Sequence, residues 1–279
     1  MILKSKLTTF LLAVLMSSIT SDAAAIFIRH DRDDAQYQEL AKNYSRSVVY
    51  FDGCVGTLIA PKWIITAKHC FASFSFSDNE PLAIKSKFWT IKHLDRQYTV
   101  NKVVPHPTDD IALINLRETV DNFTPIELYA KNDERGQKVT FVGNGGFGNG
   151  QEGKLGFDGV KRGATNIVED RDRNWLFFRF DPPIQALDLE GISGEGDSGG
   201  PAFIQQGDRL FLAGVSSGQK GGKFGTYGVR EYYARISTNL EWIENVIEQP
   251  LKQIDVKVLC AKFPLNSRCT ERGEPDLKF

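Results

Sequence analysis

One serine lies within a glycine-rich segment, Gly194-Glu195-Gly196-Asp197-Ser198-Gly199-Gly200-Pro201. Glycines around a serine bend the backbone into conformations that other side chains forbid, and this presents a hydroxyl beside exposed main-chain N–H groups. Such an arrangement suits acyl transfer, because the carbonyl oxygen that a serine attacks becomes an anion and needs fixed donors. We therefore expect an oxyanion hole formed by the N–H groups of Gly196 and Ser198.

A serine nucleophile needs a base, and the base needs an orienting acid. His69 follows the apolar run Trp63-Ile64-Ile65-Thr66, and Asp110 precedes Ile111-Ala112-Leu113-Ile114. Histidine titrates near neutral pH, and a buried carboxylate would hold its tautomer and stabilise its cation. Taken singly, the three residues have structural explanations: a packed histidine, a strand-capping aspartate and a turn serine. Together they predict a catalytic triad of His69, Asp110 and Ser198.

Short β-rich runs separated by turn residues must position these side chains, and their regular spacing indicates a barrel or sandwich. They are Ser47–Phe51, Thr57–Thr66, Tyr98–Val104, Ile111–Leu116, Lys138–Val142, Trp175–Phe180 and Leu210–Val215. Two segments are predicted to be helical, 33–43 and 239–247, the second on the period of its apolar residues. Glycine-rich 143–156 is no phosphate loop, because no helical pattern follows it.

Composition and charge exclude several classes of protein. The chain of 279 residues is 41% apolar and 25% charged with a net charge of −1, which is typical of a globular protein and not of a nucleic-acid binder. Residues 1–25 resemble a secretory signal: Lys4 and Lys6 precede an apolar run, Leu7–Met16, and Ala23 and Ala25 precede the cleavage point. A membrane anchor is the alternative, but that run is about half of the ~20 residues needed to span. We expect a secreted protein, extracellular or periplasmic in a Gram-negative bacterium, with no membrane association after signal removal.

The four cysteines can pair in three ways, and spacing favours Cys54 with Cys70 and Cys260 with Cys269. Neither pair has the spacing of a zinc site. The other histidines, His30, His93 and His106, show no ligand pattern and are expected to be structural or exposed. We predict no metal and no cofactor.

The segments around His69, Asp110 and Ser198 resemble, in this chain order, the three motifs of the trypsin/chymotrypsin-like serine proteases. The likeness covers nearly all of residues 26–250. It implies an all-β fold of two six-stranded antiparallel β-barrels with a C-terminal helix: a first barrel over about 26–125, and a second barrel and helix over about 126–250. Residues 251–279 are then a C-terminal extension with a disulfide-closed loop. The implied protein is a monomeric serine endopeptidase, a hydrolase acting on protein or peptide substrates by proteolysis, and the few disulfides are typical of a bacterial or divergent member.

The resemblance also gives the N-terminus a role. Family members become active when a new terminal Ile or Val inserts its ammonium beside the Asp before the nucleophile, which here is Asp197. Cleavage after Ala25 would expose Ile26, so signal removal itself would form the Ile26–Asp197 ion pair. The alternative is that Ile26 only starts a strand.

The substrate pocket implied by the resemblance comprises Ile192, Ser193, Ser216, Gly218 and Glu231. Trypsin itself has an acid where Ile192 stands, and an apolar floor favours an apolar side chain before the scissile bond. Glu231 on the pocket wall could instead attract a basic residue.

Three more residues receive expectations from the resemblance. Ser216 resembles the serine that hydrogen-bonds the catalytic Asp. Glu195 lies near the expected pocket mouth and could also attract a basic residue; for both glutamates a solvent-exposed position is the alternative. Lys68 stands where the family has a small residue, and it would lower the pKa of His69 or else point to solvent.

Two rival functions share these features. One is a pseudoprotease, a secreted binding protein that has lost turnover, and the complete triad argues against it. The other is an esterase with the same machinery, since acyl-enzyme chemistry is common to both.

Overall fold

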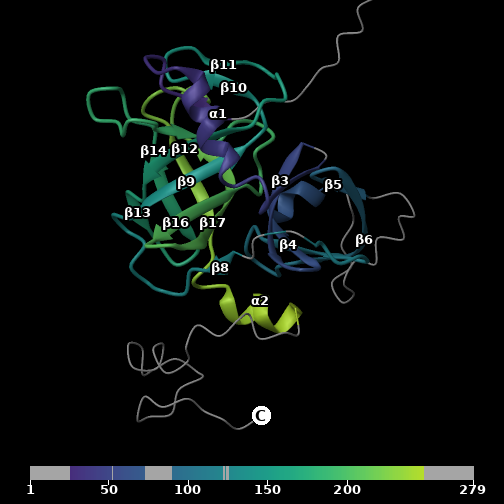
Figure 1. Ribbon diagram of the computed structural model, residues 1–279. Helices are drawn as coiled ribbons and strands as arrows, with labels where there is room; N and C mark the ends of the chain where they lie inside the picture. The colour runs from purple at the N-terminus through teal and green to yellow at the C-terminus, as the bar shows by residue number, and fades with distance from the viewer. Residues whose placement is uncertain (1–25, 52, 73–89, 122, 124–125, 248–279) are drawn as a thin grey trace, which may run out of the picture.

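Two β-barrels lie side by side in the computed structural model, which describes residues 26–247 apart from 52, 73–89, 122 and 124–125 (Figure 1). The predicted all-β double barrel with a C-terminal helix is confirmed, but the second half is an eight-stranded sheet and not the expected six-stranded barrel. The predicted signal peptide, the extension 251–279 and the Cys260–Cys269 pairing lie outside the described residues. Within the described part of the chain, no helix is both long and apolar enough to cross a bilayer.

The first barrel is closed, with strand order β2-β3-β4-β7-β6-β5. Its strands are β2 (Val48–Phe51), β3 (Cys54–Ala60), β4 (Trp63–Thr66), β5 (Thr90–His93), β6 (Arg96–Pro105) and β7 (Ala112–Leu116). The run 57–66, predicted as one strand, is two strands: Ala60 pairs with Trp63 across a turn at Pro61 and Lys62. Proline cannot donate to a central ladder, so the chain reverses there.

The second barrel is an eight-stranded curved sheet, ordered β12-β9-β16-β17-β18-β14-β13 with β8 pairing β17. Its strands are β8 (Glu127–Leu128), β9 (Lys138–Gly143), β12 (Arg162–Ile167), β13 (Asp170–Arg171), β14 (Trp175–Arg179), β16 (Pro201–Gln206), β17 (Arg209–Lys220) and β18 (Arg230–Arg235). A side chain joins β12 to β14: the Asn166 amide donates to the carbonyl of Arg179 at 3.0 Å. This bond links strands from the two ends of the curved sheet, which, unlike the first barrel, is not closed by strand pairing.

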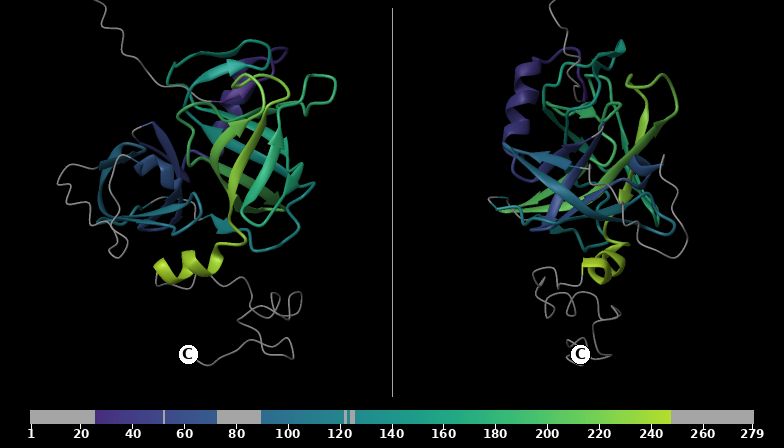
Figure 2. Two further views of the ribbon diagram at one scale, coloured as in Figure 1. Left: turned by 180° about the vertical axis from the view of Figure 1, so that it is seen from behind. Right: turned by 90° about the vertical axis from the view of Figure 1, so that its right-hand side faces the viewer.

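The N-terminal segment lies beside the second barrel and contributes β1 to a separate four-stranded sheet, although the first barrel was expected to begin near residue 26. Strand β1 (Phe27–Ile28) lies between β10 (Phe147–Asn149) and β15 (Gly191–Ile192), with β11 (Gly153–Gly156) outside β10. Helix α1 (Asp34–Lys42) begins at the N-cap Asp33 and lies beside this barrel (Figures 1 and 2). Arg162 of β12 donates to Asp34 at 2.6 Å and fixes the helix. The first barrel therefore begins at β2.

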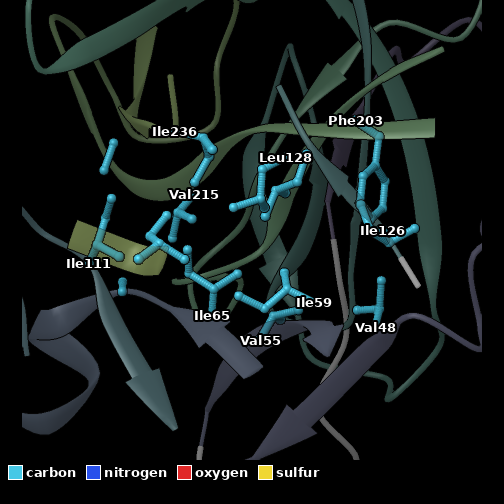
Figure 3. Close-up of a cluster of buried hydrophobic side chains, with 14 of the residues drawn as sticks. Val48, Val55, Ile59, Ile65, Ile111, Ile126, Leu128, Phe203, Val215 and Ile236 are labelled. Atoms are coloured by element: carbon cyan, nitrogen blue, oxygen red, sulfur yellow. The ribbon is translucent and has the colours of Figure 1, made fainter. Parts of the chain in front are cut away.

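An apolar cluster fills the space where the barrels meet (Figure 3). Val55 and Ile65 reach it from the first barrel, and Phe203 and Val215 reach it from the second. Helix α2 (Leu240–Ile247) follows the second barrel and buries Ile243 and Ile247 in the same cluster. Burial of this surface holds the barrels at a fixed distance, which any site built from both of them requires.

Candidate active site

The loop that carries Ser198 joins β15 to β16, and its glycines are required by geometry. Gly196 and Gly199 have φ of 93° and 83°. A Cβ on Gly199 would lie 2.0 Å from Oγ1 of Thr66, so a larger residue would push the loop away from the first barrel. The Ser198 carbonyl accepts a hydrogen bond from the N–H of Val55 at 2.8 Å. The nucleophile loop is thus anchored to the first barrel by backbone contacts.

The predicted oxyanion donors lie free at this loop. Among the described residues, neither the N–H of Gly196 nor that of Ser198 has a hydrogen-bond acceptor. Main-chain donors that lack a partner are uncommon away from solvent or ligand sites. This pair can accept an anionic oxygen without first breaking other bonds.

The imidazole of His69 lies between Ser198 and Asp110. His69 Nε2 is 2.7 Å from the Ser198 hydroxyl, and His69 Nδ1 is 2.7 Å from Oδ2 of Asp110. A carboxylate can only accept, so Nδ1 carries the proton and Nε2 is left to accept the proton of the serine. His69 lies in the short 3₁₀ helix η1 (Lys68–Phe71) after β4, and Asp110 lies just before β7. Adjacent strands β4 and β7 therefore bring the two side chains together.

Asp110 is held as an anion by its neighbours. Its Oδ1 accepts the main-chain N–H of His69 at 2.9 Å, and its Oδ2 accepts the hydroxyl of Ser217 at 2.6 Å. Burial alone would raise its pKa, but the hydrogen bonds from His69 and Ser217 outweigh burial and the pKa is lowered. The carboxylate can therefore orient the ring and stabilise its cation.

The expectation that Ser216 bonds to Asp110 is wrong, because Ser217 makes that bond. The pairing register of β17 with β18 shifts between Ser216 and Gly218. This bulge adds a residue to the strand and turns Ser217 toward the first barrel. Ser216 instead lies 2.9 Å from the hydroxyl of Ser193. No pattern in the Ser-Ser pair shows which serine faces the aspartate, so only the bulge could have identified Ser217.

The predicted Cys54–Cys70 disulfide is confirmed, with the two Cα atoms 6.3 Å apart. It joins the start of β3 to the helix η1 that carries His69. The bond therefore fixes the base relative to the barrel wall.

The carboxylate of Asp197 is buried and receives three main-chain donors. Gly145 N–H and Gly194 N–H donate at 2.7 Å each, and the nitrogen of Ile26 lies 3.1 Å from Oδ2. Burial raises the pKa of Asp197 to about 6 although these donors lower it. Gly143 is required here, because its Cβ would lie 2.1 Å from an Asp197 oxygen. The structure thus brings Ile26 and Asp197 together.

The residues predicted for the substrate pocket divide into an apolar and a polar group. Ile192 is fully buried in a cluster with Phe27, Phe180 and Val229. Gly218 lies on β17, where a Cβ would meet the hydroxyl of Tyr232 at 2.7 Å. Ile192 thus packs in the interior beside β1.

Ser193 connects the polar group. Its hydroxyl lies 2.9 Å from those of Ser216 and Tyr233, and it donates to Glu231. Its N–H donates to both carboxyl oxygens of Glu231, at 3.1 and 3.2 Å. The sequence alone did not single out Tyr233 as a member of this group.

A solvent-exposed position is wrong for Glu231, which is 1% exposed. Burial raises the pKa of Glu231 to about 8, and the charge of Asp197 also raises it, while the bonds from Ser193 lower it. Glu195 differs: its side chain is 63% exposed and pairs with Lys154. A buried acid that titrates near neutrality marks a candidate functional position.

The side chain of Lys68 does not point freely to solvent. Its ammonium donates to the carbonyls of His106 and Pro107 at 2.9 and 3.2 Å. The described residues contain no cluster of three or more side chains that could bind a metal.

Comparison with known proteins agrees with this geometry. The sequence matches the Trypsin family model over residues 32–243. It is 28% identical over 197 residues to an uncharacterized peptidase of Corynebacterium glutamicum (strain R), covering 68% of this chain and 62% of that relative. It is 27% identical over 211 residues to Trypsin 5G1 of Aedes aegypti, covering 69% of this chain and 74% of that protein. The chain thus spans less than two thirds of the bacterial relative.

The double barrel and the Ser-His-Asp arrangement between its halves define a class, the serine peptidases of chymotrypsin-like fold. The match to the family model covers most of the chain, and this protein belongs to the trypsin family.

Proposed function

We propose that this protein is a secreted serine endopeptidase that cleaves peptide bonds through an acyl-enzyme on Ser198. The observation that carries the proposal is the position of the His69 ring, 2.7 Å from both the Ser198 hydroxyl and the Asp110 carboxylate. A base within hydrogen-bond reach of a nucleophile, itself oriented by an acid, is the arrangement that acyl transfer needs.

In the first half of the reaction, His69 Nε2 takes the proton of Ser198 as Oγ bonds to the scissile carbonyl carbon. The carbonyl oxygen becomes an anion and accepts hydrogen bonds from the free N–H groups of Gly196 and Ser198. His69 then gives its proton to the leaving amine, and the C–N bond breaks. In the second half, His69 takes a proton from water, whose oxygen attacks the acyl carbon. His69 returns the proton to Ser198 Oγ as the C–O bond breaks, which releases the acid product and restores the Ser198 hydroxyl.

Activation by a new N-terminus at Ile26 is part of the proposal. Its nitrogen already lies 3.1 Å from the buried Asp197 carboxylate. Ile26 has φ of 65°, which is unfavourable for a β-branched residue joined to a preceding peptide. Cleavage after Ala25 would remove that constraint and supply the ammonium that a buried carboxylate needs.

We further propose that the residue before the scissile bond is apolar near neutral pH and that basic residues become acceptable at higher pH. Glu231, with a pKa of about 8, is mostly protonated below that pH and offers no charge to a cation. Above it, the ionised carboxylate would pair with a basic side chain.

The chain organisation proposed with this activity is a signal peptide over 1–25, a peptidase domain over 26–250 and an extension over 251–279. The mature protein acts outside the cytoplasm as a monomer on protein or peptide substrates.

The test is to purify the mature protein and its Ser198→Ala variant, and to determine the N-terminal residue of each. Both are treated with a fluorophosphonate probe and with a mixed peptide library whose products are read by mass spectrometry. Serine-dependent labelling together with internal cleavage is expected from the wild type only. Labelling without peptide cleavage would favour the esterase. No labelling from a chain that begins at Ile26 would contradict the enzyme and favour a binding protein.

A further inference from the structure

Lys68 links the segment that carries His69 to the segment that carries Asp110. It precedes His69 in η1, and its ammonium donates to the carbonyls of His106 and Pro107 at 2.9 and 3.2 Å. Those carbonyls belong to the loop between β6 and β7, which leads directly to Asp110. Charge-assisted bonds to main-chain carbonyls are stronger than neutral ones, and here two converge on one ammonium.

The loop whose carbonyls accept the Lys68 ammonium is held together by its own hydrogen bonds. Its base is closed by the N–H of His106, which donates to the carbonyl of Ile111 at 2.8 Å. Nδ1 of the His106 ring accepts the N–H groups of Thr108 and Asp109, at 3.2 and 2.8 Å. This requires an unprotonated Nδ1, and burial lowers the pKa of His106, as does the ammonium of Lys68, while Asp109 raises it. The bond from Lys68 to the His106 carbonyl therefore restrains the position of the whole loop.

The same loop is held to the second barrel by the residue beside Asp110. Oδ1 of Asp109 accepts the amide of Asn174 at 3.0 Å, and Oδ2 accepts the amide of Asn239 at 2.9 Å. The ring of His106 packs edge-on against Trp242 of α2, with centroids 4.7 Å apart. The loop thus has two supports on the second barrel and α2, and Lys68 provides the support on the η1 side.

We propose that Lys68 is a positioning residue for the proposed peptidase reaction: it closes a second bridge, beside the His69–Asp110 hydrogen bonds, that fixes Asp110 relative to His69. This inference rests on the proposed function for its kinetic consequence and on geometry for its structural one. Without the ammonium, only the His69–Asp110 bonds and the pairing of β4 with β7 would set the separation of the two segments. A catalytic constellation must be held within a fraction of an ångström, and small misplacements reduce kcat rather than binding.

The variants are Lys68→Met, which keeps much of the length and removes the donors, and Lys68→Arg, which restores charge and donors. Lys62→Met is the matched control, because Lys62 also donates to a main-chain carbonyl of the first barrel, that of Arg117 at 3.0 Å, away from the triad. Each variant is measured for kcat and KM per titrated active site and for thermal unfolding. The second readout is the low-field NMR signal of the proton between His69 Nδ1 and Asp110.

For Lys68→Met we expect kcat to fall about tenfold with KM unchanged, and the low-field proton to shift or broaden. Lys68→Arg should recover both, and Lys62→Met should change neither. Wild-type kcat and an unshifted proton in Lys68→Met would overturn the proposal, as would failure of Lys68→Arg to recover either quantity. If Lys68→Met does not fold, Lys68→Gln, which cannot reach both carbonyls, replaces it with the same criteria.

The NMR signal does not depend on turnover. A wild type without any activity would therefore sink the proposed function, while the shift of the proton in Lys68→Met would still decide the role of Lys68.

Discussion

The surroundings of Ser198 differ sharply on its two sides. On the triad side, side chains from both barrels meet near solvent: that of His69 is 40% exposed and that of Asp110 is 17% exposed. On the pocket side, Glu231 is 1% exposed, and the described groups that act on its carboxyl are Ser193 and the acid Asp197, with no cation among them. In the first region, hydrogen bonds hold Asp110 as an anion, whereas the second contains a buried acid whose charge changes with pH. The groups of the proposed reaction are thus in position without substrate, whereas the group proposed to select substrate changes its charge with pH.

The comparison is tested most strongly by Asp110→Asn. The amide would present a donor to His69, so the ring would lose its orienting acceptor and adopt the other tautomer. We expect kcat to fall about 10⁴-fold at neutral pH. Steady-state kinetics on the best library peptide measures the loss, and an unchanged melting temperature shows that it is catalytic. A loss below about tenfold would mean that the triad side does not depend on this acid.

Glu231→Gln tests the pocket side and is expected to act on selectivity. In the wild type, kcat/KM for substrates with Lys or Arg before the scissile bond should rise as the pH passes about 8, where Glu231 ionises. Glu231→Gln should lose about tenfold for these substrates at pH 9 and little for apolar ones. Equal losses for both substrate classes would show that Glu231 has a structural role instead.

The same variant has a defined effect on stability. The pKa of Glu231 is raised from an ordinary value of 4.5 to about 8, so the folded state favours the neutral carboxyl. Its contribution to the free energy of unfolding is greatest below pH 4.5, declines as the pH rises to about 8, and is constant above that. The melting temperature of Glu231→Gln relative to the wild type should therefore increase from pH 5 to pH 8. A difference that does not change with pH would contradict the raised pKa.

The smallest expected effect separates two adjacent serines. Ser217→Ala removes one donor to the Asp110 carboxylate and should lower kcat only about fivefold, because Asp110 keeps its two hydrogen bonds from His69. Ser216→Ala is the matched control, because Ser216 bonds to Ser193 in the pocket; it should leave kcat nearly unchanged and alter KM. A loss of kcat in Ser216→Ala together with a change of KM alone in Ser217→Ala would contradict this assignment of the two serines.

The two regions were also unequally predictable from sequence. His69, Asp110 and Ser198 each lie in a short segment whose residues predict the local backbone structure. The pairing of β4 with β7 then brings the segments of His69 and Asp110 together. The Cys54–Cys70 bond was predicted from the short separation of the two cysteines. Such features depend on neighbours in the chain, so one sequence was enough.

What could not be predicted depends on distant segments. The burial of Glu231 arises from its contact with Ser193, 38 residues away. The exchange of Ser216 for Ser217 arises from a bulge that has no marker in the sequence. The place of β1 could not be predicted either, because β1 pairs with β10 and β15, far along the chain. Specificity and boundaries are tertiary properties, and periodicity does not report them.

Strand β1 also has a consequence for the order of assembly. It occupies an inner position in its sheet, between β10 and β15, so residues 27–28 find their partners only once residues up to 192 have been synthesised. Pairings of such long sequence separation form late in folding, because a long loop must first be closed. A growing chain therefore cannot complete this sheet, or bring Ile26 to Asp197, until residue 197 of the 279 has emerged. The topology thus makes the Ile26–Asp197 contact at the start of the chain depend on segments from its second half.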